Sequence, residues 1–294
     1  MEKRSNDALV RPFLKWAGGK RQLLPEIKKY LPTGFNDYYE PFVGGGAVFL
    51  ALQNKKTIIN DFNSSLVNTY QVVRDHVDEL IGLLKEHEAH NSSEYYYALR
   101  SWDRSEMINQ KTSIELAARF IYLNKTGFNG LYRVNKKNQI NVPYGRYKHP
   151  AIVNEAVLRA VSQYLRDSNT QILNGDFAAA VADAKRGDFV YFDPPYAPVV
   201  DDKSSFVGYT LNGFNDDDQR RLYATFKALD ERGVYVMLSN SSVDFIHELY
   251  ADYHDTTQIV RATRAINSNA KGRGKVDEVL IMNYDYRELP TTEA

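Results

Sequence analysis

The chain has no cysteine, and this absence excludes disulfide bonds and thiolate metal sites. It also has no apolar run of membrane-spanning length, and its first residues lack the apolar core of a secretory signal. Lysine and arginine together number 37, as do aspartate and glutamate, so net charge favours no class of partner. We therefore expect a globular, cytoplasmic protein with no membrane partner, and 294 residues suffice for one large or two modest domains.

Acidic residues are missing from two long stretches. None occurs between Glu115 and Glu155 or between Asp255 and Asp277, although both intervals are rich in lysine and arginine. Aromatic residues interleave the first interval. Because positive charge neutralises phosphates and aromatic rings stack on bases, this combination favours a nucleic-acid partner over a solvated basic surface.

A proline-locked turn follows an apolar strand in the second half of the chain. Residues 189–192 read Phe-Val-Tyr-Phe, and Asp193-Pro194-Pro195-Tyr196 ends the strand. Prolines lack a backbone N–H, and the residue before a proline is held extended. A carboxylate, carbonyls without competing donors and an aromatic ring therefore meet at a strand end, where they suit a planar substrate bearing an amine. The alternative is a plain turn with a surface Asp and Tyr.

Two earlier strands end in features that suit a nucleotide-type cofactor. A strand at 38–40 leads into a glycine loop at 42–46, and a helix follows. A second strand, 57–61, ends in Asp61, about twenty residues on, where a strand-end acid can grip a ribose. The glycine spacing is not that of a dinucleotide site, which disfavours a pyrophosphate ligand. The alternatives are a plain glycine turn and, for Asp61, an N-cap of the next helix.

Strand and helix signals alternate at both ends of the chain but not in its middle. We predict an α/β fold in which residues 1–68 and 166–294 form one catalytic domain. Residues 69–165 read as mainly helical and are predicted to form a second, inserted domain. Within it, 124–147 reads as a loop and hairpin inside the acid-free interval.

These features together suit methyl transfer to an exocyclic amine. Such an amine is a poor nucleophile because its lone pair is delocalised into the ring. Hydrogen bonds to the Asp193 carboxylate and the Pro194 carbonyl would localise that pair, so that a methyl on a sulfonium centre can be attacked in line with no metal. A base inside a duplex would have to be flipped out to reach the site.

Four segments, 13–20, 40–46, 124–147 and 193–196, carry a resemblance that extends over essentially the whole chain. They resemble the Dam-type, DpnII-system-like DNA adenine-N6 methyltransferases of class alpha. The resemblance implies a Rossmann-like S-adenosylmethionine-dependent methyltransferase sheet with an inserted, mainly helical DNA-recognition domain. It implies methyl transfer to N6 of adenine in double-stranded DNA at GATC, with S-adenosylhomocysteine as product, and it allows a functional pairing with a restriction endonuclease.

The same resemblance implies roles for individual residues. The S-adenosylmethionine site would comprise Trp16, Lys20, Phe42, Gly44, Gly46, Asp61, Phe62 and Asp193. The flipped adenine would be held by Asp193, Pro194, Pro195 and Tyr196. DNA would be contacted by Lys15, Phe128, Asn129, Leu131, Arg133 and Pro143, whereas Tyr132 matches no role. The alternatives are an N4-cytosine or RNA amine methyltransferase of the same fold, and a non-catalytic DNA-binding protein.

Overall fold

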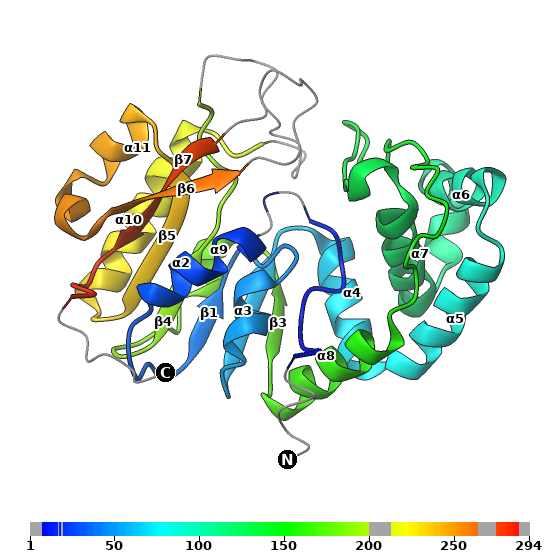
Figure 1. Ribbon diagram of the computed structural model, residues 1–294, viewed down its shortest axis with the longest axis horizontal. Helices are drawn as coiled ribbons and strands as arrows, with labels where there is room; N and C mark the ends of the chain where they lie inside the picture. Colours follow the sequence, from blue (N-terminus) through cyan, green and yellow to red (C-terminus); the bar gives the residue numbers. More distant parts are fainter. Residues whose placement is uncertain (1–7, 17, 19, 200–212, 264–274, 288–294) are drawn as a thin grey trace.

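The computed structural model describes residues 8–16, 18, 20–199, 213–263 and 275–287. A seven-stranded sheet of order β3-β2-β1-β4-β5-β7-β6 organises the fold (Figure 1). Its strands are β1 (Tyr38–Glu40), β2 (Thr57–Asp61), β3 (Gln171–Asn174), β4 (Phe189–Phe192), β5 (Tyr235–Ser241), β6 (Gln258–Thr263) and β7 (Lys275–Met282). Strands β1 to β5 pair in parallel, whereas β7 pairs antiparallel with both β5 and β6. The predicted α/β class is confirmed.

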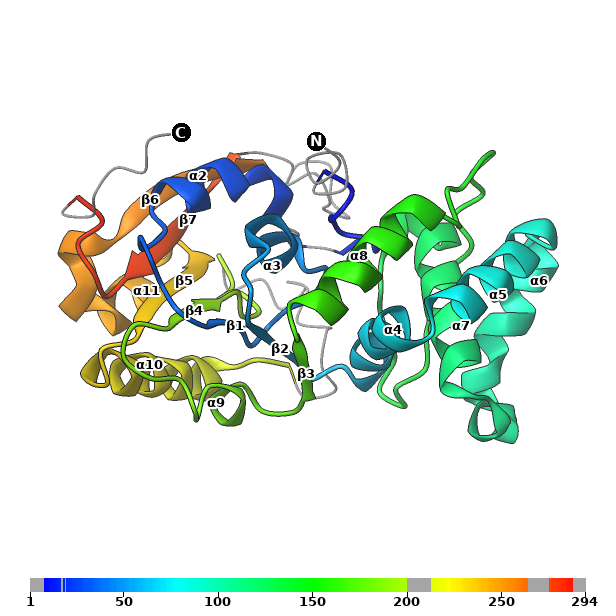
Figure 2. The ribbon, with the colours of Figure 1, turned by 90° about the horizontal axis from the view of Figure 1, so that it is seen from below.

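Side chains alternate between the two faces of the sheet, as the period of a strand requires. In β4, Val190 and Phe192 face the short helix α9 (Phe177–Ala180), with α10 (Asp216–Glu231) and α11 (Asp244–Leu249). Phe189 and Tyr191 face α2 (Leu24–Lys29) and α3 (Ala47–Leu52) on the other side. Figure 2 shows α9 and α10 below the sheet and α2 and α3 above it. Burial on both faces explains why these strands read as continuous apolar runs.

The middle of the chain folds into helices beside the sheet. They are α4 (Ser64–Asp75), α5 (Val77–Ala89), α6 (Ser93–Arg100), α7 (Ser113–Thr126) and α8 (Glu155–Asp167). Short 3-10 turns are η1 (Lys20–Gln22), η2 (Ser101–Arg104), η3 (Glu106–Gln110), η4 (Phe128–Gly130) and η5 (Ala251–Thr256). The predicted domain boundaries fall inside α4 and α8, which lie between the sheet and α5–α7 (Figure 1). The division into domains stays a prediction.

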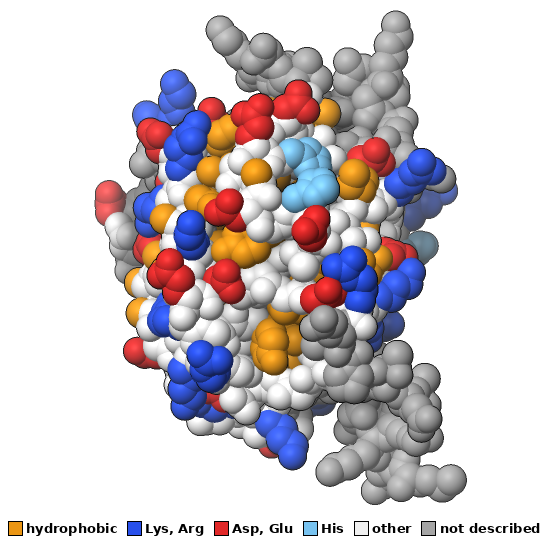
Figure 3. Space-filling model, turned by 90° about the vertical axis from the view of Figure 1, so that its left-hand side faces the viewer, with side chains coloured by type: hydrophobic (Ala, Val, Ile, Leu, Met, Phe, Trp, Pro, Cys, Tyr) orange, Lys and Arg blue, Asp and Glu red, His pale blue; other side chains and the backbone are white. Residues whose placement is uncertain are grey.

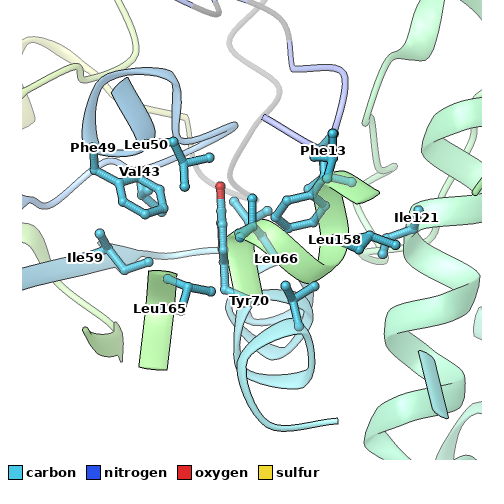
Figure 4. Packing of buried hydrophobic residues seen from close by; sticks show 14 of the residues in the cluster. Phe13, Val43, Phe49, Leu50, Ile59, Leu66, Tyr70, Ile121, Leu158 and Leu165 are labelled. Atoms are coloured by element: carbon cyan, nitrogen blue, oxygen red, sulfur yellow. The ribbon is translucent and has the colours of Figure 1, made fainter. Parts of the chain in front are cut away.

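One apolar core runs from the sheet into these helices. Tyr70 of α4 is fully buried, with its ring 5.3 Å from Phe13 and 5.9 Å from Phe49 between ring centroids. Figure 4 shows Tyr70 between these two rings, with Ile59 of β2 on one side and Ile121 of α7 on the other. Helix α4 therefore packs against both the sheet and the neighbouring helices, and its buried residues belong to one core that both contribute to.

The predicted hairpin begins later than expected. Residues 124–126 still belong to α7, which starts with a capping box formed by Thr112 and Glu115. From Gly127 onward the hairpin has only two isolated antiparallel bridges, Gly127 with Tyr144 and Val134 with Ile140. We call residues 127–145 the hairpin below.

The hairpin is held in place largely through its own main chain. The Val142 carbonyl accepts hydrogen bonds of 2.9 Å from both the Tyr96 hydroxyl and Arg100 Nη1. The Ile140 N–H donates to Asp103 Oδ2 at 2.7 Å, and Asp103 is itself paired with Arg119 at 3.1 Å. Helices α6 and α7 and turn η2 thus form a seat that fixes the hairpin backbone.

The face of the molecule formed by α10 and α11 carries interspersed acidic and basic side chains (Figure 3). Lys227, for example, pairs with Asp252 at 3.5 Å. The first acid-free interval lies away from this face, on α7 and the hairpin. Most of the second, residues 264–274, lies outside the described residues. Among the helices that the structure describes, none is long and apolar enough to cross a membrane.

Candidate active site

The site lies where the strand order changes direction. From β1 the chain moves outward through β2 to β3, then returns to place β4 beside β1 and continues outward the other way. Tyr38 pairs with Phe189 and Tyr39 with Val190, so the loops after β1 and β4 leave the same edge of the sheet side by side. Open α/β sheets bind ligands at this switch point. The glycine loop and Asp193 therefore lie together, as predicted from sequence.

Trp16 lies directly against the glycine loop. A Cβ on Gly44 would come within 2.8 Å of the Trp16 indole nitrogen, and one on Gly45 within 2.9 Å of the Trp16 Cβ. Gly46 has φ +71°, and a Cβ there would lie 2.3 Å from a ring carbon of Phe49. Only glycine fits at positions 44 and 46 without strain, because a side chain there would meet both a positive φ and an occupied neighbourhood. Phe42 packs beneath the loop against Phe177, at 5.2 Å between ring centroids.

Asp61 fastens the end of β2 to the glycine loop. Its Oδ2 accepts the Gly44 N–H at 3.0 Å and its Oδ1 accepts the Asn63 N–H at 2.9 Å. Burial raises the pKa of this carboxyl, and the backbone hydrogen bonds oppose the rise. Asn63, not Asp61, caps α4, so the capping alternative for Asp61 is wrong. Phe62, next in the chain, is 66% exposed.

Asp193, Lys20 and Tyr196 form a compact group beyond β4. Lys20 Nζ lies 2.8 Å from Asp193 Oδ1 and 4.5 Å from the centroid of the Tyr196 ring. Burial raises the pKa of Asp193 to about 6, while the Lys20 ammonium holds it down. Lys20 is itself only 5% exposed, so this ion pair is shielded from water on its lysine side. The structure thus brings Lys20 of the first motif together with the Asp193–Tyr196 motif.

The proline turn is fixed by polar side chains from α10 and β5. Gln219 Nε2 donates to the Pro195 carbonyl at 3.0 Å, and the Ala197 N–H donates to Asn240 Oδ1 at 3.0 Å. Asn240 and Gln219 are joined at 3.1 Å. Within the described part of the chain, no hydrogen bond reaches the Pro194 carbonyl. Gln219 and Asn240 thus fix the turn, and the Pro194 carbonyl can still accept a hydrogen bond.

Lys15 is held by Asn124 of α7 and lies beside Gly130 of the hairpin. The amide of buried Asn124 accepts the Lys15 N–H at 2.9 Å and donates to the Lys15 carbonyl at 2.7 Å. The same amide donates to the Gly130 carbonyl at 3.2 Å. The Lys15 ammonium lies 4.3 Å from the ring centroid of Tyr147, and partial burial lowers the pKa of Lys15.

The remaining predicted DNA contacts all lie on the hairpin. Phe128 is 50% exposed, and both Asn129 and Pro143 are exposed next to it. The Phe128 N–H donates to the Pro143 carbonyl at 2.8 Å, which holds the two strands of the hairpin together here. Leu131 and Arg133 are half-buried, and Arg133 Nε donates to Asn141 Oδ1 at 2.7 Å. Asn141 therefore fixes the direction of the guanidinium.

No cluster of three or more metal-ligating side chains occurs among the residues that the structure describes. The family model for the D12 class of N6 adenine-specific DNA methyltransferases matches residues 16–266, most of the chain. The chain belongs to this class. Its fold is accordingly that of an S-adenosylmethionine-dependent methyltransferase, and its activity is N6 adenine methylation of DNA.

Several relatives of this D12-class methyltransferase are similar over nearly their full length. The Type II methyltransferase M1.LlaDCHI of Lactococcus lactis subsp. cremoris is 49% identical over 95% of this chain and 97% of its own length. M.MjaIII of Methanocaldococcus jannaschii is 46% identical over 94% of this chain and 99% of its own. The DNA adenine methylase of Escherichia coli K12 is 37% identical over 92% and 95%. The class favours adenine over the N4-cytosine and RNA alternatives.

Two acids of this methyltransferase's site received no role from the sequence. Glu278 of β7 accepts a hydrogen bond of 2.8 Å from the Tyr196 hydroxyl. Glu40, at the end of β1, accepts from the Tyr38 hydroxyl at 2.7 Å and from the Phe49 N–H at 2.8 Å. Burial raises the pKa of Glu40 to about 8, and the nearby charge of Asp193 adds to the rise. An acid that directly adjoins the apolar residues of a strand, as at both positions, is the sequence signal that could have found them.

Proposed function

We propose that this methyltransferase acts at GATC in double-stranded DNA and methylates a flipped-out adenine by direct, in-line transfer from S-adenosylmethionine. The observation that carries the proposal is the meeting of Asp193, Lys20 and Tyr196 beside the glycine loop. Positioning supplies most of the catalysis in such a transfer. Base flipping follows because N6 of a stacked, paired adenine cannot reach a group at the sheet edge.

The residues around the glycine loop fit S-adenosylmethionine. The Asp61 carboxylate accepts backbone hydrogen bonds from Gly44, Asn63 and Phe62, and its two oxygens offer about four acceptor positions, which leaves capacity for a ribose hydroxyl. The exposed Phe62 ring offers a face for an adenine ring, and the side-chain-free loop allows close approach of the ligand. When bound, S-adenosylmethionine supplies a methyl group on a positively charged sulfur.

Asp193 and the Pro194 carbonyl are the acceptors for the two N6 hydrogens of adenine. Hydrogen bonds to both would localise the nitrogen lone pair for attack on the methyl group. S-adenosylmethionine, held by the residues around the glycine loop, would supply that methyl group and leave as the neutral thioether S-adenosylhomocysteine. The proton lost by N6 passes to the Asp193 carboxylate, whose pKa of about 6 makes it an adequate acceptor near neutral pH. Tyr196, held by Glu278, offers its ring to the base.

We assign residues 69–165 as the target-recognition domain and the hairpin as its reading element. The guanidinium of Arg133, held by Asn141, is suited to a bidentate contact with a guanine edge. Lys15 is placed for a second guanine, Leu131 and Pro143 for the remaining bases, and the exposed Phe128 ring with Asn129 for entry into the base stack. The choice of GATC rests on the match of these residues to the Dam-type pattern.

The test is to treat unmethylated plasmid DNA with the protein and S-adenosylmethionine and to map N6-methyladenine by sequencing. We expect methylation confined to GATC; modification at another sequence would overturn the proposed site. Asp193→Ala should abolish transfer, and Asp183→Ala, a control at an exposed aspartate, should not. Near-normal transfer by Asp193→Ala would contradict its catalytic role.

By likeness to the relatives named Type II methyltransferases, we also propose that a restriction endonuclease is paired with this protein. Plasmid methylated by the protein should then resist an endonuclease that cuts at GATC. Cutting of fully modified plasmid by every such enzyme would remove the support for this pairing.

A further inference from the structure

Tyr132 lies between two of the proposed base-reading residues but faces the opposite way. Leu131 and Arg133 are half-buried, whereas Tyr132 is 9% exposed. Leu131 has extended backbone angles, φ −74° and ψ 143°, and side chains alternate along an extended segment. A shift of the hairpin that moves the two reading residues toward DNA must therefore also move the Tyr132 ring inside the protein.

The ring of Tyr132 stacks on Trp16. Their ring centroids are 5.8 Å apart and the planes differ by 16°, while Phe120 supports Tyr132 at 5.1 Å. The indole of Trp16 lies against Gly44, and its Cβ and Cγ lie against Gly45. The Trp16 side chain thus contacts both Tyr132 of the hairpin and the glycine loop directly.

The hydroxyl end of Tyr132 reaches the second half of the proposed cofactor site. Burial raises the pKa of this hydroxyl, and hydrogen bonding with the side chains of Asn63 and Ser65 opposes the rise. Asn63 caps α4 and donates its N–H to Asp61 Oδ1 at 2.9 Å. Tyr132 therefore stacks on Trp16, and its hydroxyl end lies near Asn63, whose N–H is bound to Asp61.

We propose that Tyr132 is a positioning residue that couples occupancy of the cofactor site to seating of the hairpin on DNA. A ligand that presses on Trp16 and the glycine loop favours one position of the Tyr132 ring, and that ring fixes Leu131 and Arg133. The coupling is reciprocal, because a free energy that links two sites acts equally on both ligands. This inference rests on the proposed function, since it takes the hairpin as the DNA-reading element.

The test is a binding cycle with S-adenosylhomocysteine, which permits no turnover. Its Kd is measured by calorimetry with and without a saturating GATC duplex, for the native protein, Tyr132→Leu, Tyr132→Phe and Tyr144→Leu. Tyr144 is the matched control, because it is another hairpin tyrosine whose ring packs on Tyr96 at 5.3 Å instead of on Trp16. Thermal melting confirms that each variant is folded.

We expect the duplex to tighten binding to the native protein by a factor on the order of ten, within the usual range for coupled sites. Tyr132→Leu should reduce that factor to about one to two, with the cofactor still bound, whereas Tyr144→Leu should keep it. Tyr132→Phe retains the stack and loses the hydroxyl that reaches Asn63, so it should lower the factor in part. If the leucine variant fails to fold, an unchanged factor in Tyr132→Phe overturns the link through Asn63.

An unchanged factor in a folded Tyr132→Leu protein would overturn the coupling role, as would a native protein that binds both ligands independently. Failure of the native protein to bind either ligand would instead refute the proposed function. The two proposals therefore fail in distinguishable ways.

Discussion

Replacement of Lys20 by glutamine should move the acid limb of methyl transfer to higher pH. Transfer needs Asp193 ionised, so the rate falls as pH decreases through the pKa of this carboxyl. That pKa is about 6 because burial raises it while the Lys20 ammonium, 2.8 Å away, lowers it. Lys20→Gln removes the lowering contribution and leaves the burial. The pKa of Asp193 must then rise.

The size of the effect follows from the geometry. An opposite charge within roughly 4–6 Å lowers a carboxyl pKa by about 1–3 units. Loss of Lys20 should therefore place the pKa of Asp193 at roughly 7–9. At pH 7 the native carboxyl is about 90% ionised, whereas a carboxyl of pKa 8 is about 10% ionised, so the rate constant should fall by about tenfold at this pH and recover at higher pH.

The assay is single-turnover transfer to a GATC duplex between pH 5 and 9.5, at saturating S-adenosylmethionine so that weaker cofactor binding does not obscure the limb. Lys20→Arg, which keeps the charge, should retain a limb near pH 6. Lys29→Gln, which removes a 60%-exposed lysine paired with Glu26, is the control for loss of one positive charge. A limb that stays near pH 6 in Lys20→Gln would falsify the electrostatic reasoning.

Four other substitutions test separate parts of the structure. Asp61→Ala should weaken S-adenosylhomocysteine binding in calorimetry by about tenfold or more, with DNA affinity little changed; equal cofactor affinity would contradict the ribose role. Arg133→Ala should relax site preference in methylation mapping by about 1–3 kcal/mol and leave cofactor affinity intact. Gly46→Ala should lower the free energy of unfolding by about 2–4 kcal/mol in urea melts, since a Cβ there meets a ring at 2.3 Å, while Gly82→Ala, with open space around it, should not. His87, whose pKa burial lowers to about 4, stays neutral when folded and takes up a proton when unfolded, so stability falls between pH 6.5 and 4. His87→Phe should remove about 2–3 kcal/mol of the loss measured between pH 7 and 4.5, and an unchanged acid loss would contradict this assignment.

The strands and loops of the site could be predicted because each is encoded locally. A few neighbouring residues determine the conformation of each of these segments: the strand at 189–192, the glycine loop and the end of β2. In the structure, their bounds lie within a residue or two of the predicted ones. The family resemblance then indicated that these loops form one site. Prediction of the hairpin start was wrong by three residues, because the capped helix α7 continues through Thr126.

Contacts between distant segments could not be predicted. Tyr196 and its partner Glu278 are 82 residues apart, and their pairing depends on β7 lying antiparallel beside β5. The stack of Tyr132 on Trp16 likewise depends on how the hairpin folds back over the first motif. Periodicity indicates which face a residue occupies but not which residue from another segment lies opposite.

The way in which the hairpin is seated has a consequence for how recognition can evolve. The seat holds carbonyl and amide groups of Val142 and Ile140, which every amino acid except proline supplies in full. The side chains at positions such as 131 and 133 can therefore change without loss of the hydrogen bonds that hold the hairpin backbone. A lineage of such enzymes could explore new target sequences by exchange of a few side chains while methyl-transfer chemistry, built on other loops, continues undisturbed.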